Sequence, residues 1–151
     1  MKNLRGARIA LLGLSYKPGT DDLHDSPALD IATQVIEYGA FVSAYDPVVK
    51  ALPAGLPVRI ASDAYAAAEG ADAVVVATEW PQFLDLDFAR LRSAMKGELL
   101  FDGRNCLSPT IVGSAGFVYE GVGRRAPGSA RRYRSRRRRS LPAAVLRGTP
   151  R

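Results

Sequence analysis

The chain has 151 residues and a mass of 16.2 kDa, which suits one compact domain. Hydrophobic residues make up 47% of the chain and charged residues 24%, an ordinary balance for a water-soluble globular protein. No apolar run approaches the ~20 residues of a transmembrane helix. The chain has one cysteine, which excludes a disulfide framework within one chain, and with one histidine it also cannot form a cysteine- or histidine-rich metal site. The apolar run after the basic N-terminus is too short for a signal peptide, so we expect a cytoplasmic protein without a metal.

The formal net charge of +6 is divided unevenly along the chain. Residues 1–123 hold ten Lys/Arg and fifteen Asp/Glu, a balance of −5, whereas residues 124–151 hold eleven Arg and no acid, a balance of +11. A block of like charge repels itself and cannot bury a core. We therefore predict a folded domain over residues 1–123 and a disordered, Arg-rich tail over residues 124–151.

Apolar runs alternate with amphipathic segments along the predicted domain. The continuous apolar run of residues 8–14 is typical of a strand buried on both faces of a parallel sheet. Other strands are expected at residues 41–45, 58–60, 73–77, 98–102 and 117–119. Helices are expected at residues 27–38, 64–69 and 87–95, the first of them between Ser26 as N-cap and Gly39 as stop. This order predicts an α/β fold, a doubly wound (Rossmann-like), mainly parallel sheet in a single domain.

Ligands of an open parallel sheet bind beyond the carboxyl ends of its strands. The first loop at this edge, taken from Gly13 to Asp22, is rich in glycine, but it contains neither the G-x-G-x-x-G of a dinucleotide site nor the G-x-x-x-x-G-K-[ST] of a P-loop. Asp46 ends the second strand, as the ribose-binding acid of a dinucleotide site does, yet it lies well beyond the expected spacing of about 20 residues. A simple turn at Asp46-Pro47 is the favoured interpretation.

Two basic residues follow strands at the same edge. Lys17 lies in the first loop, and Arg104 directly follows the strand at residues 98–102. A lysine presents a point charge to a phosphate, and an arginine forks onto phosphate or sugar oxygens. Together they would flank one crevice that suits a diphosphate. The alternatives are a solvated lysine and a salt bridge from Arg104 to Asp102 or another neighbour.

Three more side chains have both a functional and a structural interpretation. Trp80 would stack on a ligand ring or cover the core, and covering the core is favoured. Cys106 would act as a nucleophile only if a base lay beside it or if the pKa of its thiol were lowered. Arg104 would have to lower that pKa, and no histidine other than His24 could act as the base, so a structural cysteine is favoured. His24 is a lone loop histidine, and such a residue is usually just polar.

The segment from Leu12 to Ala28 resembles the opening motif of the C-terminal, UDP-binding domain of UDP-glucose/GDP-mannose dehydrogenases. Later motifs of that family are matched in the same order by Ala44-Tyr-Asp-Pro47, Ala77-Thr-Glu-Trp80, Phe101-Asp-Gly-Arg-Asn105 and residues 116–123. The resemblance covers residues 5–124. It implies a UDP-sugar-binding domain of an NAD-dependent oxidoreductase that oxidises the C6 alcohol of a nucleotide-sugar to a uronate. By motif position, Tyr16 and Lys17 would contact the nucleotide-sugar and Arg104 would help to hold it.

The resemblance also implies that this segment is incomplete as an enzyme. In the family, the NAD-binding domain, the dimerisation region, the nucleophilic cysteine and the catalytic lysine precede it. No catalytic residue is therefore expected here, and Cys106 does not correspond to the nucleophile. The loop after Thr20 reaches NAD in the full enzyme, usually through an arginine where this chain has His24, which makes His24 a weak candidate for a cofactor contact. NAD is expected to be bound mainly by a domain absent from this chain, and a separately encoded NAD-binding domain is one possible partner.

The Arg-rich tail lies outside the resemblance and leaves a second hypothesis open. Such a run binds phosphate backbones in a salt-dependent way, as in a basic nucleic-acid-binding protein. A tail with eleven Arg and no Lys, beginning where the resemblance stops, favours an altered reading frame instead. A truncated or frameshifted product and a split subunit both fit this pattern.

Overall fold

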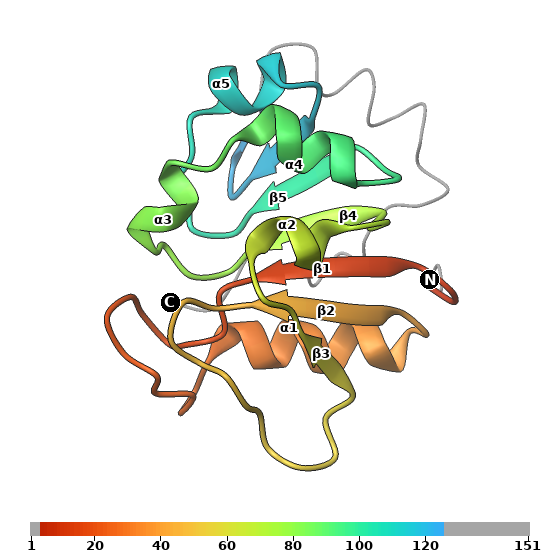
Figure 1. The fold of residues 1–151 in the computed structure, drawn as a ribbon, viewed down its shortest axis with the longest axis vertical. Helices are drawn as coiled ribbons and strands as arrows, with labels where there is room; N and C mark the ends of the chain where they lie inside the picture. Colours follow the sequence, from red (N-terminus) through yellow and green to blue (C-terminus); the bar gives the residue numbers. More distant parts are fainter. Residues whose placement is uncertain (1–3, 126–151) are drawn as a thin grey trace.

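The apolar run near the N-terminus forms β1 (Arg8–Leu12), an interior strand of a seven-stranded sheet in the computed structural model, which describes residues 4–125 (Figure 1). Its side chains alternate between two cores. Ile9 and Leu11 pack on one face of the sheet, and Ala10 and Leu12 pack on the other. Burial on both faces is the reason that this run is continuously apolar, as predicted.

The sheet is parallel except at one edge. Its order is β3-β2-β1-β4-β5-β6-β7, and only β7 runs antiparallel to its neighbour. The strands that join β1 are β2 (Phe41–Tyr45), β3 (Val58–Ile60), β4 (Ala73–Val76), β5 (Leu99–Asp102), β6 (Val118–Gly121) and β7 (Arg124–Arg125). The doubly wound, mainly parallel sheet predicted from the sequence is confirmed.

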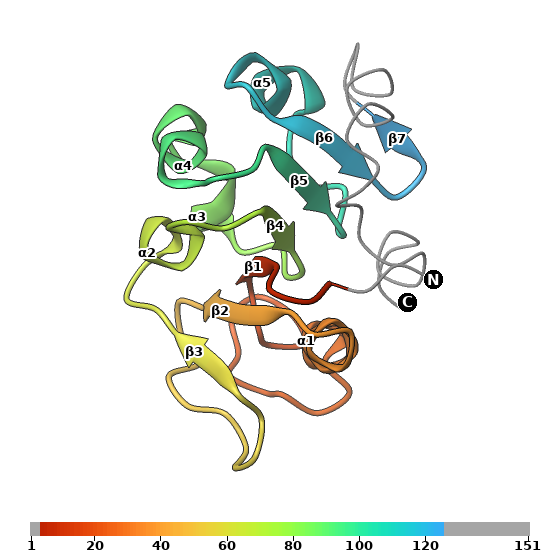
Figure 2. The ribbon, with the colours of Figure 1, turned by 90° about the vertical axis from the view of Figure 1, so that its right-hand side faces the viewer.

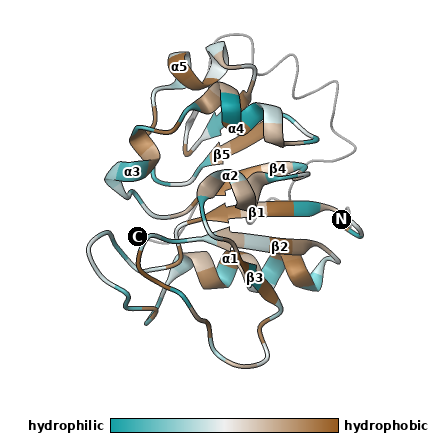
Figure 3. Cartoon of the chain, viewed as in Figure 1, coloured by the Kyte–Doolittle hydropathy of each residue, from teal (hydrophilic) through white to brown (hydrophobic). Residues whose placement is uncertain are grey.

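Helices cover both faces of the sheet (Figure 2). On one face lies α1 (Pro27–Glu37), and on the other lie α2 (Ala64–Ala68), α3 (Pro81–Leu84), α4 (Phe88–Ala94) and α5 (Pro109–Ser114). In Figure 3, β1 is hydrophobic along most of its length, whereas α1 and α4 carry both hydrophobic and hydrophilic stretches. This is the pattern of helices that pack one side on a sheet. Within residues 4–125, no helix is both long and apolar enough to cross a membrane.

The helix starts follow local signals in the sequence. Asp63 and Asp87 cap α2 and α4 by accepting hydrogen bonds from the amides of Ala66 (2.7 Å) and Arg90 (3.0 Å). Ser26 stands at the N-cap of α1, as predicted, but its hydroxyl forms no cap hydrogen bond and donates instead to the Leu14 carbonyl. The start of α1 is thereby tied to the loop that follows β1.

Three elements were not predicted, and each has a local cause. Pro81 and Pro109 occupy the first helical positions of α3 and α5, a start signal that Pro27 provides for α1. β7 pairs with β6 through a turn at Gly123, whose φ of +75° favours glycine. Because β7 contains Arg124–Arg125, the domain extends two residues past the predicted boundary at 123. The rest of the predicted disordered tail, residues 126–151, lies outside the described residues.

Candidate functional site

The sheet has a topological switch point between β1 and β4. From β1 the chain runs to α1 on one face, and from β4 it runs to α3 and α4 on the other face, although the two strands are hydrogen-bonded neighbours. The loops after these strands diverge at the carboxyl edge, which is where ligands of doubly wound sheets bind. The loops after β2 and β5 flank this point on either side.

The loops after β1 and β4 pack closely against each other at the switch point. Gly13 follows β1 with a φ of +98°, and a Cβ added to it would lie 2.5 Å from Cβ of Thr78, which follows β4. The Thr78 hydroxyl donates to the Ser15 carbonyl at 2.9 Å. No side chain larger than hydrogen fits at position 13, so these two loops have a fixed relative position.

The carboxylate of Asp46, directly after β2, holds these loops together by hydrogen bonds. The residue is fully buried, and its two oxygens accept hydrogen bonds from three neighbouring loops. Oδ1 accepts from the amides of Val48 and Val49 (both 2.9 Å), and Oδ2 from Leu14 N (2.8 Å), Ser15 N (3.1 Å), Ser15 Oγ (3.3 Å) and Trp80 Nε1 (3.2 Å). With both oxygens occupied, Asp46 is a structural residue and is not available as a ribose-binding acid.

Burial and hydrogen bonding act in opposite directions on the pKa of Asp46. Burial raises it, but the backbone amides of Val49, Leu14, Val48 and Ser15 stabilise the ionised form and hold the pKa below its ordinary value of 3.8. Trp80, one of the other donors, is only 6% exposed and packs in the core on the α2 and α4 side. The favoured interpretation of Trp80 as a core residue is therefore correct.

A second buried aspartate organises the loop after β5. Asp102 accepts hydrogen bonds from Leu107 N at 2.8 Å and from the Tyr119 hydroxyl at 2.9 Å through Oδ2, and from Arg104 N at 3.2 Å through Oδ1. Asn105, with a φ of +52°, exchanges two 2.8 Å hydrogen bonds with the backbone of Val122. The loop that carries Arg104 is thereby held at both ends.

The Arg104 side chain bridges the loops after β5 and β4. Its Nη2 lies 2.9 Å and its Nε 3.2 Å from Oε1 of Glu79, with the arginine side chain 25% exposed and the glutamate 44%. This ion pair is the neighbour contact that the sequence left as an alternative. Sequence reasoning did not single out Glu79, although its place directly after β4, at the same edge as Arg104, was a usable signal.

The loop between β1 and α1 presents the other predicted residues. Tyr16 is 42% exposed and Lys17 is exposed, while Tyr16 N donates to Asp22 O at 2.8 Å and closes the loop on itself. His24 is exposed, and its Nε2 lies 3.2 Å from Oδ2 of Asp25. Lys17 and Arg104 lie on loops that leave the same sheet edge on either side of β4. That they bind one ligand together remains a prediction.

Comparison with known proteins decides the family. Residues 10–109 match the model of the UDP binding domain of the UDP-glucose/GDP-mannose dehydrogenase family. The chain belongs to this family. UDP-glucose 6-dehydrogenases of Pseudomonas aeruginosa and Rhizobium meliloti are 43% and 45% identical to it over 80% and 81% of its length. The chain spans only 28% of either relative.

A solved structure has the same fold. The chain is similar to an NDP-N-acetyl-D-galactosaminuronic acid dehydrogenase from Methanosarcina mazei, with a TM-score of 0.73 and 28% identity over 83% of this chain and 26% of that one. These relatives are dehydrogenases, and they give no support to the alternative of a nucleic-acid-binding protein. The resemblance to the UDP-glucose/GDP-mannose dehydrogenase family, inferred from the motifs, is confirmed.

The pKa of Cys106 distinguishes this thiol from a dehydrogenase nucleophile. Burial, followed by the nearby Asp102 carboxylate, raises its pKa from 9.0 to about 12. The Sγ lies 3.7 Å from Oδ1 of Asp102. The idea that Arg104 lowers this pKa is therefore wrong, because burial and the acidic neighbours raise it, and the structural interpretation of Cys106 holds. Within residues 4–125, no three His, Cys, Asp or Glu side chains are grouped so as to hold a metal ion.

Members of this dehydrogenase family use NAD, but the residues at the switch point do not fit it. The loop after β1 lacks a dinucleotide fingerprint, and the glycine that directly follows the strand, Gly13, is in contact with Thr78 rather than open to a pyrophosphate. Asp46, which would have to bind the ribose, has both oxygens occupied by protein donors. This part of the chain is therefore not a dinucleotide site.

Proposed function

We propose that this chain binds the nucleoside diphosphate part of a UDP-sugar at the carboxyl edge of its sheet. Tyr16 and Lys17 would contact the ligand from the loop after β1, and Arg104 would contact it from the loop after β5. The observation that carries the proposal is that both loops lie within the matched UDP binding domain and flank its switch point. Phosphate oxygens would meet a lysine ammonium and an arginine guanidinium, which are the side chains best suited to them.

The Glu79–Arg104 ion pair supplies a geometry for binding. The guanidinium carries five N–H donors, and Glu79 accepts from its Nε and Nη2. Glu79 thereby orients the guanidinium at the carboxyl edge of the sheet, while it also offsets the positive charge there. A bound diphosphate would share Arg104 with Glu79 or displace it.

The oxidation itself would require a further domain. We propose that an NAD-binding domain with the nucleophile, outside these 151 residues, completes the enzyme, which would oxidise the C6 alcohol of the UDP-sugar to a uronate. Two observations support this proposal. The chain covers 28% of the length of the two UDP-glucose 6-dehydrogenases, and the residues at its own switch point do not fit a dinucleotide. His24, exposed on the same loop as Lys17, would face that domain and its NAD.

Calorimetric titration with UDP at fixed salt tests the binding proposal. A charge-assisted hydrogen bond to phosphate contributes about 1.5–3 kcal/mol, so Lys17→Ala and Arg104→Ala should each weaken UDP binding by about 10- to 150-fold. Lys96→Ala is the matched control, because Lys96 is exposed between α4 and the start of β5, at the opposite edge. Lys50 is a poorer control because it follows β2 at the ligand edge.

A double variant separates a direct contact from an indirect one. Arg104→Ala leaves Glu79 without its ion pair, and an unpaired carboxylate would by itself repel a diphosphate. If Arg104 binds phosphate directly, Glu79→Ala/Arg104→Ala should bind UDP as weakly as Arg104→Ala. Recovery of the parent affinity in the double variant, or parent-like affinity in both single variants, would show that Arg104 does not hold the phosphate.

A further inference from the structure

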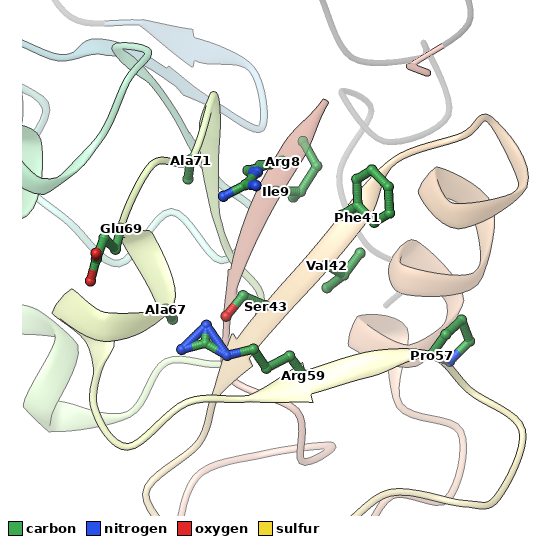
Figure 4. Close-up of a pocket in the computed structure, with 10 residues that line it drawn as sticks. All are labelled: Arg8, Ile9, Phe41, Val42, Ser43, Pro57, Arg59, Ala67, Glu69 and Ala71. Carbon is green, nitrogen blue, oxygen red and sulfur yellow. The ribbon is translucent and has the colours of Figure 1, made fainter. Parts of the chain in front are cut away.

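A pocket lies at the amino ends of β1, β2 and β3, at the edge of the sheet opposite the proposed UDP site (Figure 4). It has a volume of about 360 Å³, within the range of about 300–1,000 Å³ that is usual for small-molecule sites. The pocket exists because α2 is only five residues long and leaves part of this sheet face uncovered. Its wall on the α2 side consists of Ala67, Glu69 and Ala71.

Strand register brings two arginines to this face. Arg8 pairs with Phe41, Ala10 pairs with Ser43, and Ser43 pairs with Arg59, so side chains of three adjacent strands lie on the same side of the sheet. Figure 4 shows the Arg59 guanidinium beside the Ser43 hydroxyl, and the Arg8 side chain directed to the same side of the sheet. Both arginines are exposed.

No carboxylate of the described residues pairs with the guanidinium of either arginine, and the nearby Asp72 carboxylate accepts instead from the backbone amide of Arg8 at 2.9 Å. Within residues 4–125, no ion pair or hydrogen bond involves the side chain of Arg8 or Arg59. Glu69 is the only acidic residue that lines the pocket, and it pairs with neither guanidinium. The two exposed guanidinium groups are therefore available to an anion from outside this part of the chain.

The Ser43 hydroxyl provides an independent indication of a ligand. Its Oγ is buried and has no hydrogen-bond partner among the described residues. A buried hydroxyl without a partner is unfavourable and uncommon in native proteins. Because this oxygen has almost no accessible surface, an acceptor would reach it only after the neighbouring Arg59 side chain moves outward (Figure 4). The hydroxyl would then donate to the acceptor by rotation about its C–O bond.

We propose that this pocket binds a phosphate group, either free inorganic phosphate or the phosphate of a monoester. Arg8 and Arg59 would pair with its oxygens from β1 and β3, and Ser43 would donate to a third oxygen from β2. Donors on three strands suit a tetrahedral oxyanion better than a planar carboxylate, which one arginine fork satisfies. Phe41, 67% exposed at the pocket, offers an apolar surface to the organic part of an ester. The proposal is independent of UDP binding, which involves the other edge of the sheet.

The test is a titration of the full chain, followed by amide NMR shifts, with inorganic phosphate and with phenyl phosphate at fixed ionic strength. Saturable shifts are expected at residues 8–10, 41–43 and 58–60. These positions separate the pocket from any phosphate that binds to the Arg-rich tail. Tighter binding of phenyl phosphate would assign an ester as the ligand, and equal affinities would assign inorganic phosphate.

Variants make the test specific. Arg8→Ala and Arg59→Ala should each weaken binding by about 10- to 150-fold, whereas Lys96→Ala, which removes a positive charge at the same edge outside the pocket, should leave it unchanged. Ser43→Ala should weaken binding about tenfold without lowering the midpoint of thermal unfolding, because its hydroxyl has no partner to lose. Absence of saturable shifts at the amino edge, or an equal loss in Lys96→Ala and Arg59→Ala, would overturn the proposal.

Discussion

Replacing Asp46 by Asn should destabilise the domain severely, even though the two side chains have nearly the same shape. Asp46 only accepts hydrogen bonds, and each of its oxygens faces at least two N–H donors. An asparagine must place its NH₂ group against one of these sets. In the cheaper orientation, the amides of Val48 and Val49 lose their acceptor. At about 1–3 kcal/mol for each buried unsatisfied donor, the loss is about 2–6 kcal/mol.

The assay is urea unfolding followed by tryptophan fluorescence. Trp80 is the only tryptophan in the chain, and its indole N–H binds the Asp46 carboxylate, so the probe reports on the site itself. Asp63→Asn is the matched control, because Asp63 is an exposed N-cap and asparagine caps helices about as well as aspartate. A loss below about 1 kcal/mol for Asp46→Asn, or an equal loss for the control, would refute the argument.

The pH dependence of this loss has a definite sign. The folded-state pKa of Asp46 is lowered, so the ionised carboxylate contributes stability above the unfolded pKa, near 3.8, and the contribution is lost as the pH falls through the lower folded-state pKa. The difference in unfolding free energy between the parent and Asp46→Asn should therefore be full at neutral pH and narrow below about pH 4. A difference that widens on acidification would contradict the assignment.

Two further predictions concern the chemistry that this chain lacks. Raising the pKa of Cys106 from 9.0 to about 12 reduces its thiolate fraction at pH 8, and the greater nucleophilicity of a more basic thiolate offsets only part of this loss, so iodoacetamide should modify the folded chain at least about tenfold slower than the urea-unfolded chain. Similar rates in the two states, measured by mass spectrometry, would show that the Cys106 thiol is not held in this environment. The second prediction concerns turnover: the purified chain should form no NADH from NAD and UDP-glucose, because its switch point does not fit a dinucleotide and Cys106 is not activated. Turnover by the chain alone would disprove the need for a partner domain.

Local sequence patterns were sufficient to predict the layers of this fold. The run at β1 is apolar at every position from Ile9 to Leu12, which indicates burial on two faces, and Pro27 and Gly39 bound α1 through their own backbone preferences. The family motifs are also contiguous, so they were recognisable without a structure. The signals for α3 and α5 were equally local, at Pro81 and Pro109, although the prediction did not use them.

The contacts of the candidate site were decided only by the tertiary structure. Asp46 and Trp80 lie 34 residues apart in the chain, and Arg104 and Glu79 lie 25 apart, so no local window contains either pair. They meet because β1 lies between β2 and β4, and β4 between β1 and β5, an order that depends on the packing of the whole sheet. For the same reason, the sequence by itself indicated a basic carboxyl edge but not that Glu79 holds Arg104. Nor did it indicate that Arg8, Ser43 and Arg59 share one face, because that depends on the register of three strands and on how little of them α2 covers.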